Sequence, residues 1–261
     1  MIRALLILPA VLLAACAGGP AAPPSAASVP VAEQIPYTDL QKIAKAHGDL
    51  AMVYYQGGNM AVALQEARIA LAADPAYAPA YNVMGLVQMY LGETPQAQAS
   101  FERAVQLAPQ DSEIANHYGW FLCLAGRERE SFPFFLSAVK NPLYKSPTKP
   151  YTNAGLCALR IKDDKAAEEY FQRAAMADGS NAQAIFHLAD IAFRRGDFYK
   201  ARNFLGEVLR LSDPNAEALW LAVRIERKLG DRHAEAGFSA QLRRKFSGTP
   251  EHQALMQGKF E

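Results

Sequence analysis

A turn signal returns at a nearly fixed interval along most of this chain. Its period is 34 residues or a near multiple of 34, and the chain also carries "DP" at Asp74 and Asp213 and "AP" at Ala108. The recurring turn glycines are Gly58, Gly92, Gly126, Gly196 and Gly230. A unit of this length cannot bury its apolar face alone, so neighbouring units must stack. The period therefore predicts a repeat protein.

The residues within each unit follow the tetratricopeptide pattern, which consists of two antiparallel helices. The second unit, "PAYNVMGLVQMYLGETPQAQASFERAVQLAP", is the clearest: Gly85 and Ala97 stand where two helices approach closely, and Phe101 fills the space beside them. We predict an all-α fold, a right-handed superhelical solenoid of about six tetratricopeptide helix pairs over residues 35–246. The sixth pair is degenerate, as expected of a terminal cap, and residues 247–261 form a tail or short helix.

One connector breaks the period. Between the third and fourth units the chain reads "AVKNPLYKSPTKPYTNAG", which is two residues longer than the norm and contains three prolines. We expect a longer, stiffer connector there that projects from the stack.

The N-terminus has the features of a secretory signal. Residues 1–15 combine Arg3 with an apolar run that is far shorter than the roughly 20 residues of a membrane span. The "LAAC" ending resembles a bacterial lipobox, which implies that Cys16 is acylated after cleavage; an ordinary signal peptide with an incidental cysteine is the alternative. Ala17, rather than Asp, follows the cysteine and favours transport to the outer membrane. Residues 16–34 are rich in Pro, Ala, Gly and Ser and predict a flexible linker.

Composition excludes several classes of function. The chain carries 27 Lys and Arg against 26 Asp and Glu, so its net charge of +1 gives no reason to expect nucleic acid. The five histidines show no paired metal-ligand spacing, and no phosphate loop or nucleophile elbow is present. We therefore expect no metal, no cofactor, no small-molecule substrate and no catalytic residues.

The inner face of the predicted solenoid carries an unusual apolar stripe. In tetratricopeptide repeats this face takes roughly positions 2, 5, 9, 12 and 13 of each unit. The candidate protein-binding groove consists of Met52, Tyr55, Asn82, Leu86, Met89, Tyr90, Asn116, Trp120, Leu156, Phe186 and Phe193. Exposed apolar patches mark partner sites, and Trp and Tyr are frequent in binding hot spots. The alternative is that some of these residues belong to the core and are displaced by one position of register.

Two cysteines occupy the first helices of the third and fourth units. Cys123 and Cys157 are 34 residues apart, on adjacent and roughly parallel helices. They could form a disulfide, remain buried thiols, or include a nucleophile. An oxidising periplasm favours the disulfide, and the nucleophile lacks a histidine at a corresponding position.

Several strings resemble a known family. "HYGWFLCLAGRERESFPFFLSAVKNPLY", "YTNAGLCALRIKD", "AEEYFQRAA" and "LWLAVRIERKLGD" are similar to the type IV pilus biogenesis and stability lipoproteins called PilF or PilW. The resemblance implies an outer-membrane lipoprotein that faces the periplasm. It also implies a pilotin or assembly role toward the secretin of the type IV pilus machine, a PilQ-type subunit. A general envelope scaffold, serving outer-membrane protein assembly or peptidoglycan machinery, is the alternative function.

Overall fold

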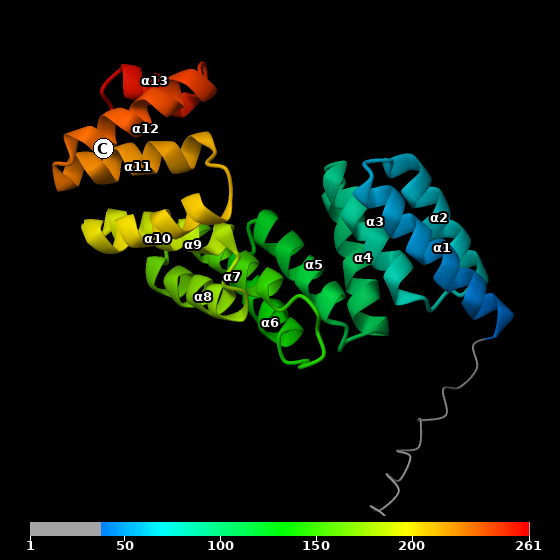
Figure 1. Cartoon of the computed structure of the whole chain (residues 1–261). Coiled ribbons are helices and arrows are strands. Elements are labelled where there is room, and N and C mark those ends of the chain that lie inside the picture. Colours follow the sequence, from blue (N-terminus) through cyan, green and yellow to red (C-terminus); the bar gives the residue numbers. More distant parts are fainter. Residues whose placement is uncertain (1–37, 261) are drawn as a thin grey trace, which may run out of the picture. The chain divides into compact units, whose positions relative to one another are not determined.

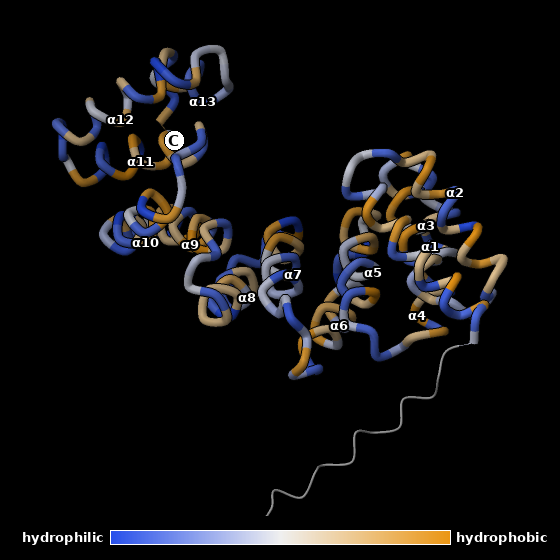
Figure 2. The backbone as a smooth tube through the Cα atoms, turned by 45° about the vertical axis from the view of Figure 1, so that its right-hand side comes forward, coloured by the Kyte–Doolittle hydropathy of each residue, from blue (hydrophilic) through white to orange (hydrophobic). Residues whose placement is uncertain are grey.

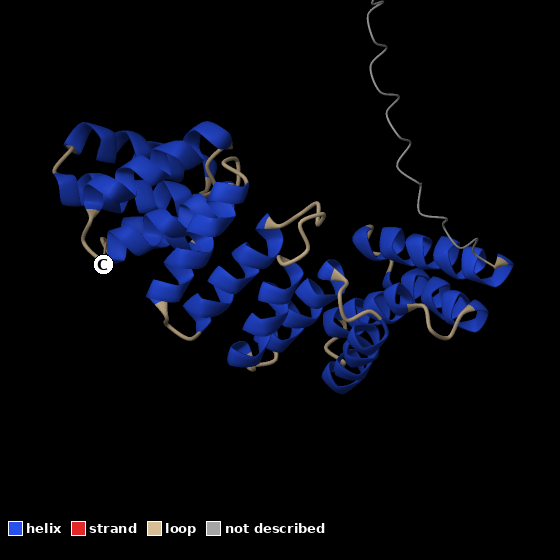
Figure 3. Ribbon diagram, turned by 90° about the horizontal axis from the view of Figure 1, so that it is seen from below, coloured by secondary structure: helices blue, strands red, loops and turns tan. Residues whose placement is uncertain are grey.

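The computed structural model describes residues 38–260, which form thirteen helices and contain no strand (Figures 1 and 3). The predicted signal peptide, Cys16 and the linker lie outside the described residues. Within residues 38–260, no helix combines the length and hydrophobicity that a membrane span requires. The helices are α1 (Asp39–Gln56), α2 (Met60–Ala73), α3 (Ala78–Tyr90), α4 (Thr94–Leu107), α5 (Ser112–Leu124), α6 (Glu128–Ala138), α7 (Thr148–Arg160), α8 (Asp164–Ala177), α9 (Ala182–Arg194), α10 (Phe198–Leu211), α11 (Ala216–Leu229), α12 (Arg232–Lys245) and α13 (Pro250–Met256).

Twelve of these helices form six consecutive pairs. Each odd-numbered helix from α1 to α11 packs most extensively against the helix that follows it, and the second helix of one pair contacts the first helix of the next. The first helices of neighbouring pairs also touch one another, and hydrophobic segments continue along the whole row (Figure 2). The predicted all-α solenoid of six helix pairs is confirmed. The predicted tail contains α13, which packs on α11 and α12.

The turns inside the pairs explain the periodic glycines. Gly58, Gly92, Gly126, Gly196 and Gly230 all adopt the left-handed conformation, with φ between 76° and 83°. Glycine enters this region without the steric cost that a Cβ atom imposes. The fourth pair differs, because Lys162 takes the equivalent turn position with φ 60°. A lysine therefore accepts the strained conformation where the glycine period is interrupted.

Small residues allow the two helices of a pair to approach closely. A Cβ atom added at Gly155 would lie 2.6 Å from Cε1 of Phe171, and Gly85 and Gly119 meet phenylalanine rings in the same way. The ring of Phe171 has no exposed surface. In the fifth pair an alanine, Ala189, takes the glycine position and belongs to a cluster with the smaller Leu205. The larger residue on the first helix is thus matched by a smaller residue on the second helix, as dense packing requires.

The long connector between α6 and α7 is attached to the solenoid through Tyr144. The hydroxyl group of Tyr144 donates a hydrogen bond to the Glu113 carboxylate on α5. Burial raises the pKa of Tyr144 far above its usual value, and the hydrogen bond to the Glu113 carboxylate raises it further. Its neighbour Leu143 remains 84% exposed. The connector therefore projects, as predicted, but only around Leu143.

Candidate protein-binding surface

The structure divides the predicted groove residues into three groups by exposure. Tyr90 is 68% exposed, at the C-terminal end of α3. The partly buried members are Met52, Tyr55, Met89, Trp120, Leu156 and Phe186. The buried members are Asn82, Leu86, Asn116 and Phe193. The inner face is thus only partly an open apolar surface.

The four buried residues correct the prediction, because they do not line an exposed groove. The Nδ1 atom of His117 on α5 donates a hydrogen bond to the side-chain oxygen of Asn82 at 3.1 Å. The side-chain amide of Asn153 on α7 donates to the Asn116 carbonyl at 3.0 Å. Both asparagines are 3% exposed and join neighbouring first helices, since an unpaired amide in this position would be costly. Their function is structural.

The two buried apolar residues fill contacts inside the solenoid. Leu86 belongs to a cluster with Phe101 and Phe121. The ring of Phe193 lies under the guanidinium of Arg224, with Cζ 4.7 Å from the ring centroid. Register position alone placed them on the inner face, but the adjacent helix covers them there. Leu86 and Phe193 are therefore core residues that the repeat pattern had placed on the surface. This is the alternative that the sequence left open.

The partly buried residues pack against neighbouring helices and also keep part of their surface accessible to solvent. Met52 and Tyr55 on α1 pack against the clusters around Val83 and Leu86, and burial raises the pKa of the Tyr55 hydroxyl. Met89 contacts the Leu86 cluster as well. A charged substitution at these positions would therefore disturb the junction between repeats as well as any partner. Tyr90 offers a cleaner test of binding.

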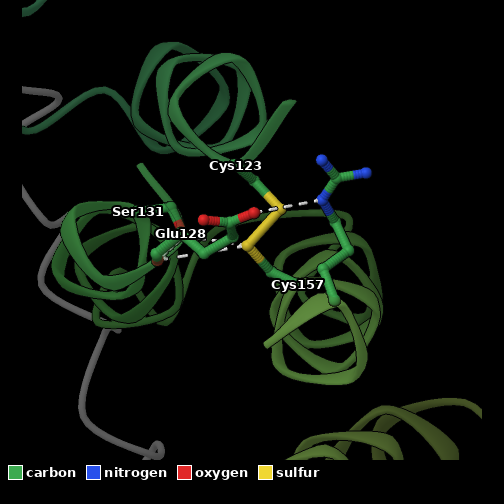
Figure 4. Close-up of a disulfide and its surroundings, with 5 residues drawn as sticks. Cys123, Glu128, Ser131 and Cys157 are labelled. Atoms are coloured by element: carbon green, nitrogen blue, oxygen red, sulfur yellow. Dashed lines mark hydrogen bonds and ion pairs between the residues drawn. A yellow bond between two sulfur atoms is a disulfide. The ribbon is translucent and has the colours of Figure 1, made fainter. Parts of the chain in front are cut away.

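Trp120 packs beside the cysteine pair. A disulfide joins Cys123 on α5 to Cys157 on α7, with Cα atoms 5.9 Å apart and both side chains fully buried (Figure 4). The Ser131 hydroxyl on α6 lies 3.2 Å from the Cys157 sulfur. Neither sulfur is a free thiolate, so the nucleophile hypothesis has no support here. The pair instead ties the third repeat to the fourth.

An exposed apolar stripe on α1 was missed by the sequence reasoning. The exposed large apolar residues of this helix are Leu40, Ile43, Leu50, Val53 and Tyr54. Most follow helical spacing, so one stripe of α1 lies open, apart from the face that packs on α2 and α3. The helical spacing of these apolar residues in the sequence could have revealed the stripe.

Further exposed apolar residues lie at or just after the C-terminal ends of α3 and α5. Leu91 is 49% exposed beside Tyr90, and Leu124 is 44% exposed at the end of α5. Tyr90 and Leu124 occupy equivalent positions in successive repeats. We call the α1 stripe together with Tyr90, Leu91 and Leu124 the N-terminal apolar surface. Exposed apolar residues gathered in one region mark sites of protein interaction.

Among the described residues, no group of three or more His, Cys, Asp or Glu side chains is placed to hold a metal ion. The features that remain are helix packing, a disulfide and exposed apolar side chains. This arrangement suits the binding of another polypeptide.

Comparisons with known proteins agree with this arrangement. Models of the tetratricopeptide repeat match residues 82–146 and 148–181. The type IV pilus assembly protein PilF of Pseudomonas aeruginosa is 27% identical over 208 residues, which cover 80% of this chain and 82% of PilF. The chain is a tetratricopeptide-repeat protein that is similar to PilF over most of its length.

Solved structures give the same result. The crystal structure of PilW, described as a widely conserved type IV pilus biogenesis factor, superimposes with a TM-score of 0.74 at 29% identity and covers 82% of this chain and 99% of PilW. The structure of Pseudomonas aeruginosa PilF gives a TM-score of 0.78 at 25% identity, covering 85% of this chain and all of PilF. Both likenesses extend over nearly the whole solenoid. Tetratricopeptide domains of this kind are protein-interaction scaffolds.

Proposed function

We propose that this protein acts in type IV pilus biogenesis as an outer-membrane lipoprotein that promotes localisation and multimerisation of the secretin. The observation that carries the proposal is the similarity to PilF and PilW across the solenoid. The exposed apolar residues of the first three repeats support it, because they provide a surface for another polypeptide.

The N-terminal apolar surface is the part of the molecule that we assign to the secretin subunit. Tyr90 and Val53 are 68% and 61% exposed, so they contribute little to packing and remain available to a partner. Burying such side chains against an apolar segment contributes about 1.5–3 kcal/mol each. A segment with a few apolar side chains spaced along it would fit this surface.

Cys16 has the second role in the proposal. Acylation there would hold the domain at the inner leaflet of the outer membrane, and the linker would let it reach its partner. Tethering raises the effective concentration of the binding surface at that membrane, without any new contact. Secretin subunits bound to the surface would then assemble at the outer membrane.

The variant Cys16→Ser separates anchoring from binding. We expect the protein to fold and to bind the secretin subunit, while secretin multimers fail to reach the outer membrane. Fractionation of the two membranes, followed by immunoblotting for the secretin, measures this. Wild-type amounts of multimer in the outer membrane of the Cys16→Ser strain would contradict the anchoring role.

A further inference from the structure

A recessed site lies on the C-terminal repeats, far along the row of helices from the N-terminal apolar surface. It is a pocket of about 300 Å³ between first helices of the last three pairs and α13. Its lining residues are Leu159, Phe186, His187, Asp190, Glu217, Trp220, Arg224 and Glu251. A pocket of this size holds a single side chain together with a short stretch of backbone, which is at the small end for ligand sites.

One side of the pocket is formed by an arginine held between aromatic rings. The Cζ atom of Arg224 lies 4.7 Å from the ring centroid of Phe193 and 5.8 Å from that of Trp220. Its Nε atom is buried and has no hydrogen-bond partner in the described chain. The nearest carboxylate, that of Asp190, is 3.9 Å away. Two ring faces and one long ion pair to Asp190 thus hold this guanidinium.

The buried Nε atom also limits what the pocket can bind. Because Nε has no access to solvent, a carboxylate ligand could bond Arg224 only through its terminal nitrogens, one of which already lies 3.9 Å from the Asp190 carboxylate. Burial lowers the pKa of Arg224, whose charge has little compensation beyond Asp190. Asp190 itself accepts a hydrogen bond from Nε of Arg194 at 3.0 Å. Arg224 therefore belongs to the wall of the pocket.

Two carboxylates at the pocket have no partner. Glu217 on α11 and Glu251 on α13 make no ion pair or hydrogen bond through their side chains within residues 38–260. By contrast, Glu226 on the same helix as Glu217 is paired with Arg202. Together with Asp190, the lining therefore contains three acidic side chains and one guanidinium. An incoming cation meets complementary charge here, and an anion meets repulsion.

We propose that this pocket binds a lysine or arginine side chain of a partner polypeptide. The aliphatic stem of that side chain packs against Trp220 and Phe186, and its charged head pairs with Glu217 and Glu251. Glu217 lies on α11 in the terminal pair, and Glu251 lies on α13, which packs against that pair. The pocket is therefore specific to this end of the solenoid. The inference does not depend on which partner occupies the N-terminal apolar surface.

Peptide titration followed by NMR tests this proposal. The protein is the mature chain with Cys16→Ser, which keeps it soluble, and the probes are acetylated, amidated pentapeptides of alanine with a central lysine or arginine. Matched peptides carry norleucine or glutamate at the centre. The indole N–H signal of Trp220 should shift with the lysine and arginine peptides and much less with the other two. The signal of Trp120, which packs beside the disulfide, should stay unchanged.

Charge variants complete the test. The double variant Glu217→Gln and Glu251→Gln should weaken binding of the lysine peptide at least tenfold and leave the melting temperature unchanged. Glu207→Gln is the matched control, because Glu207 is exposed on α10 and does not line the pocket. Equal shifts with the lysine and norleucine peptides, stronger binding of the glutamate peptide, or no response at Trp220 would each overturn the proposal. None of these results bears on secretin assembly.

Discussion

Reduction of the Cys123–Cys157 disulfide is expected to lower the free energy of unfolding by about 4 kcal/mol, the chain-entropy value for a closed loop of this length. The sulfur atoms join residues 34 positions apart, on α5 and α7. The bond spans the junction of the third and fourth repeats, where the two-residue insertion lengthens the connector. Without it the unfolded chain gains the freedom of the whole intervening segment.

Urea unfolding with and without dithiothreitol, followed by circular dichroism, measures this loss. The double variant Cys123→Ser and Cys157→Ser is the control, since the reductant should not shift its unfolding midpoint. A change below about 1 kcal/mol on reduction of the wild-type protein would show that the packing of α5 on α7 needs no covalent link.

Phe171→Ala is expected to cost about 3–5 kcal/mol of folding free energy, as large-to-small changes at fully buried aromatics do. The Phe171 ring lies directly against Gly155, where a Cβ atom would be only 2.6 Å from it, and the ring also stacks on His187, with centroids 4.8 Å apart. No side chain at Gly155 can move in to fill the space. The variant therefore leaves a cavity between α7 and α8.

Tyr199→Ala provides the comparison for this loss. Tyr199 is 72% exposed on α10, so its truncation should change stability by no more than about 0.5 kcal/mol. Thermal and urea unfolding of both variants would decide the matter. Equal effects at Phe171 and Tyr199 would mean that the ring-on-glycine contact contributes little to the repeat.

The fold followed from the sequence because its main determinants repeat. A glycine with positive φ ends the first helix of most pairs, and a small residue meets a large one at each close approach, so each unit reinforces the same interpretation. Lys162 shows the limit of this reasoning. The backbone there adopts the left-handed turn because its neighbours in the pair require it, although the residue itself does not favour it.

The binding surface was less predictable, and for a physical reason. Repeat position fixes the direction of a side chain on its own helix, but its burial depends on the neighbouring helix. Asn82 and Asn116 were expected on the open inner face, yet both are buried and form hydrogen bonds with the next first helix. The α1 stripe shows the converse case, since Leu40 and Val53 are exposed within residues 38–260 although they are apolar and lie on the first helix of a pair.

The pocket on the C-terminal repeats could not have been found from the period. Glu251 reaches the lining from α13, outside the six pairs, and its approach to Trp220 depends on how the last helix folds back. The disulfide was partly predictable from the sequence. The sequence left it open beside buried thiols, and the structure brings the two sulfur atoms together.

The central claim is that the N-terminal apolar surface binds a secretin subunit. Binding of the detergent-solubilised subunit to the mature protein, measured by biolayer interferometry, tests it most directly when Tyr90→Glu is compared with Tyr199→Glu. The two tyrosines are similarly exposed, at 68% and 72%, so neither change should disturb the fold. We predict that Tyr90→Glu weakens binding at least about tenfold, as loss of an interface anchor does, and that Tyr199→Glu does not. Equal affinity of both variants and the wild-type protein would contradict the claim.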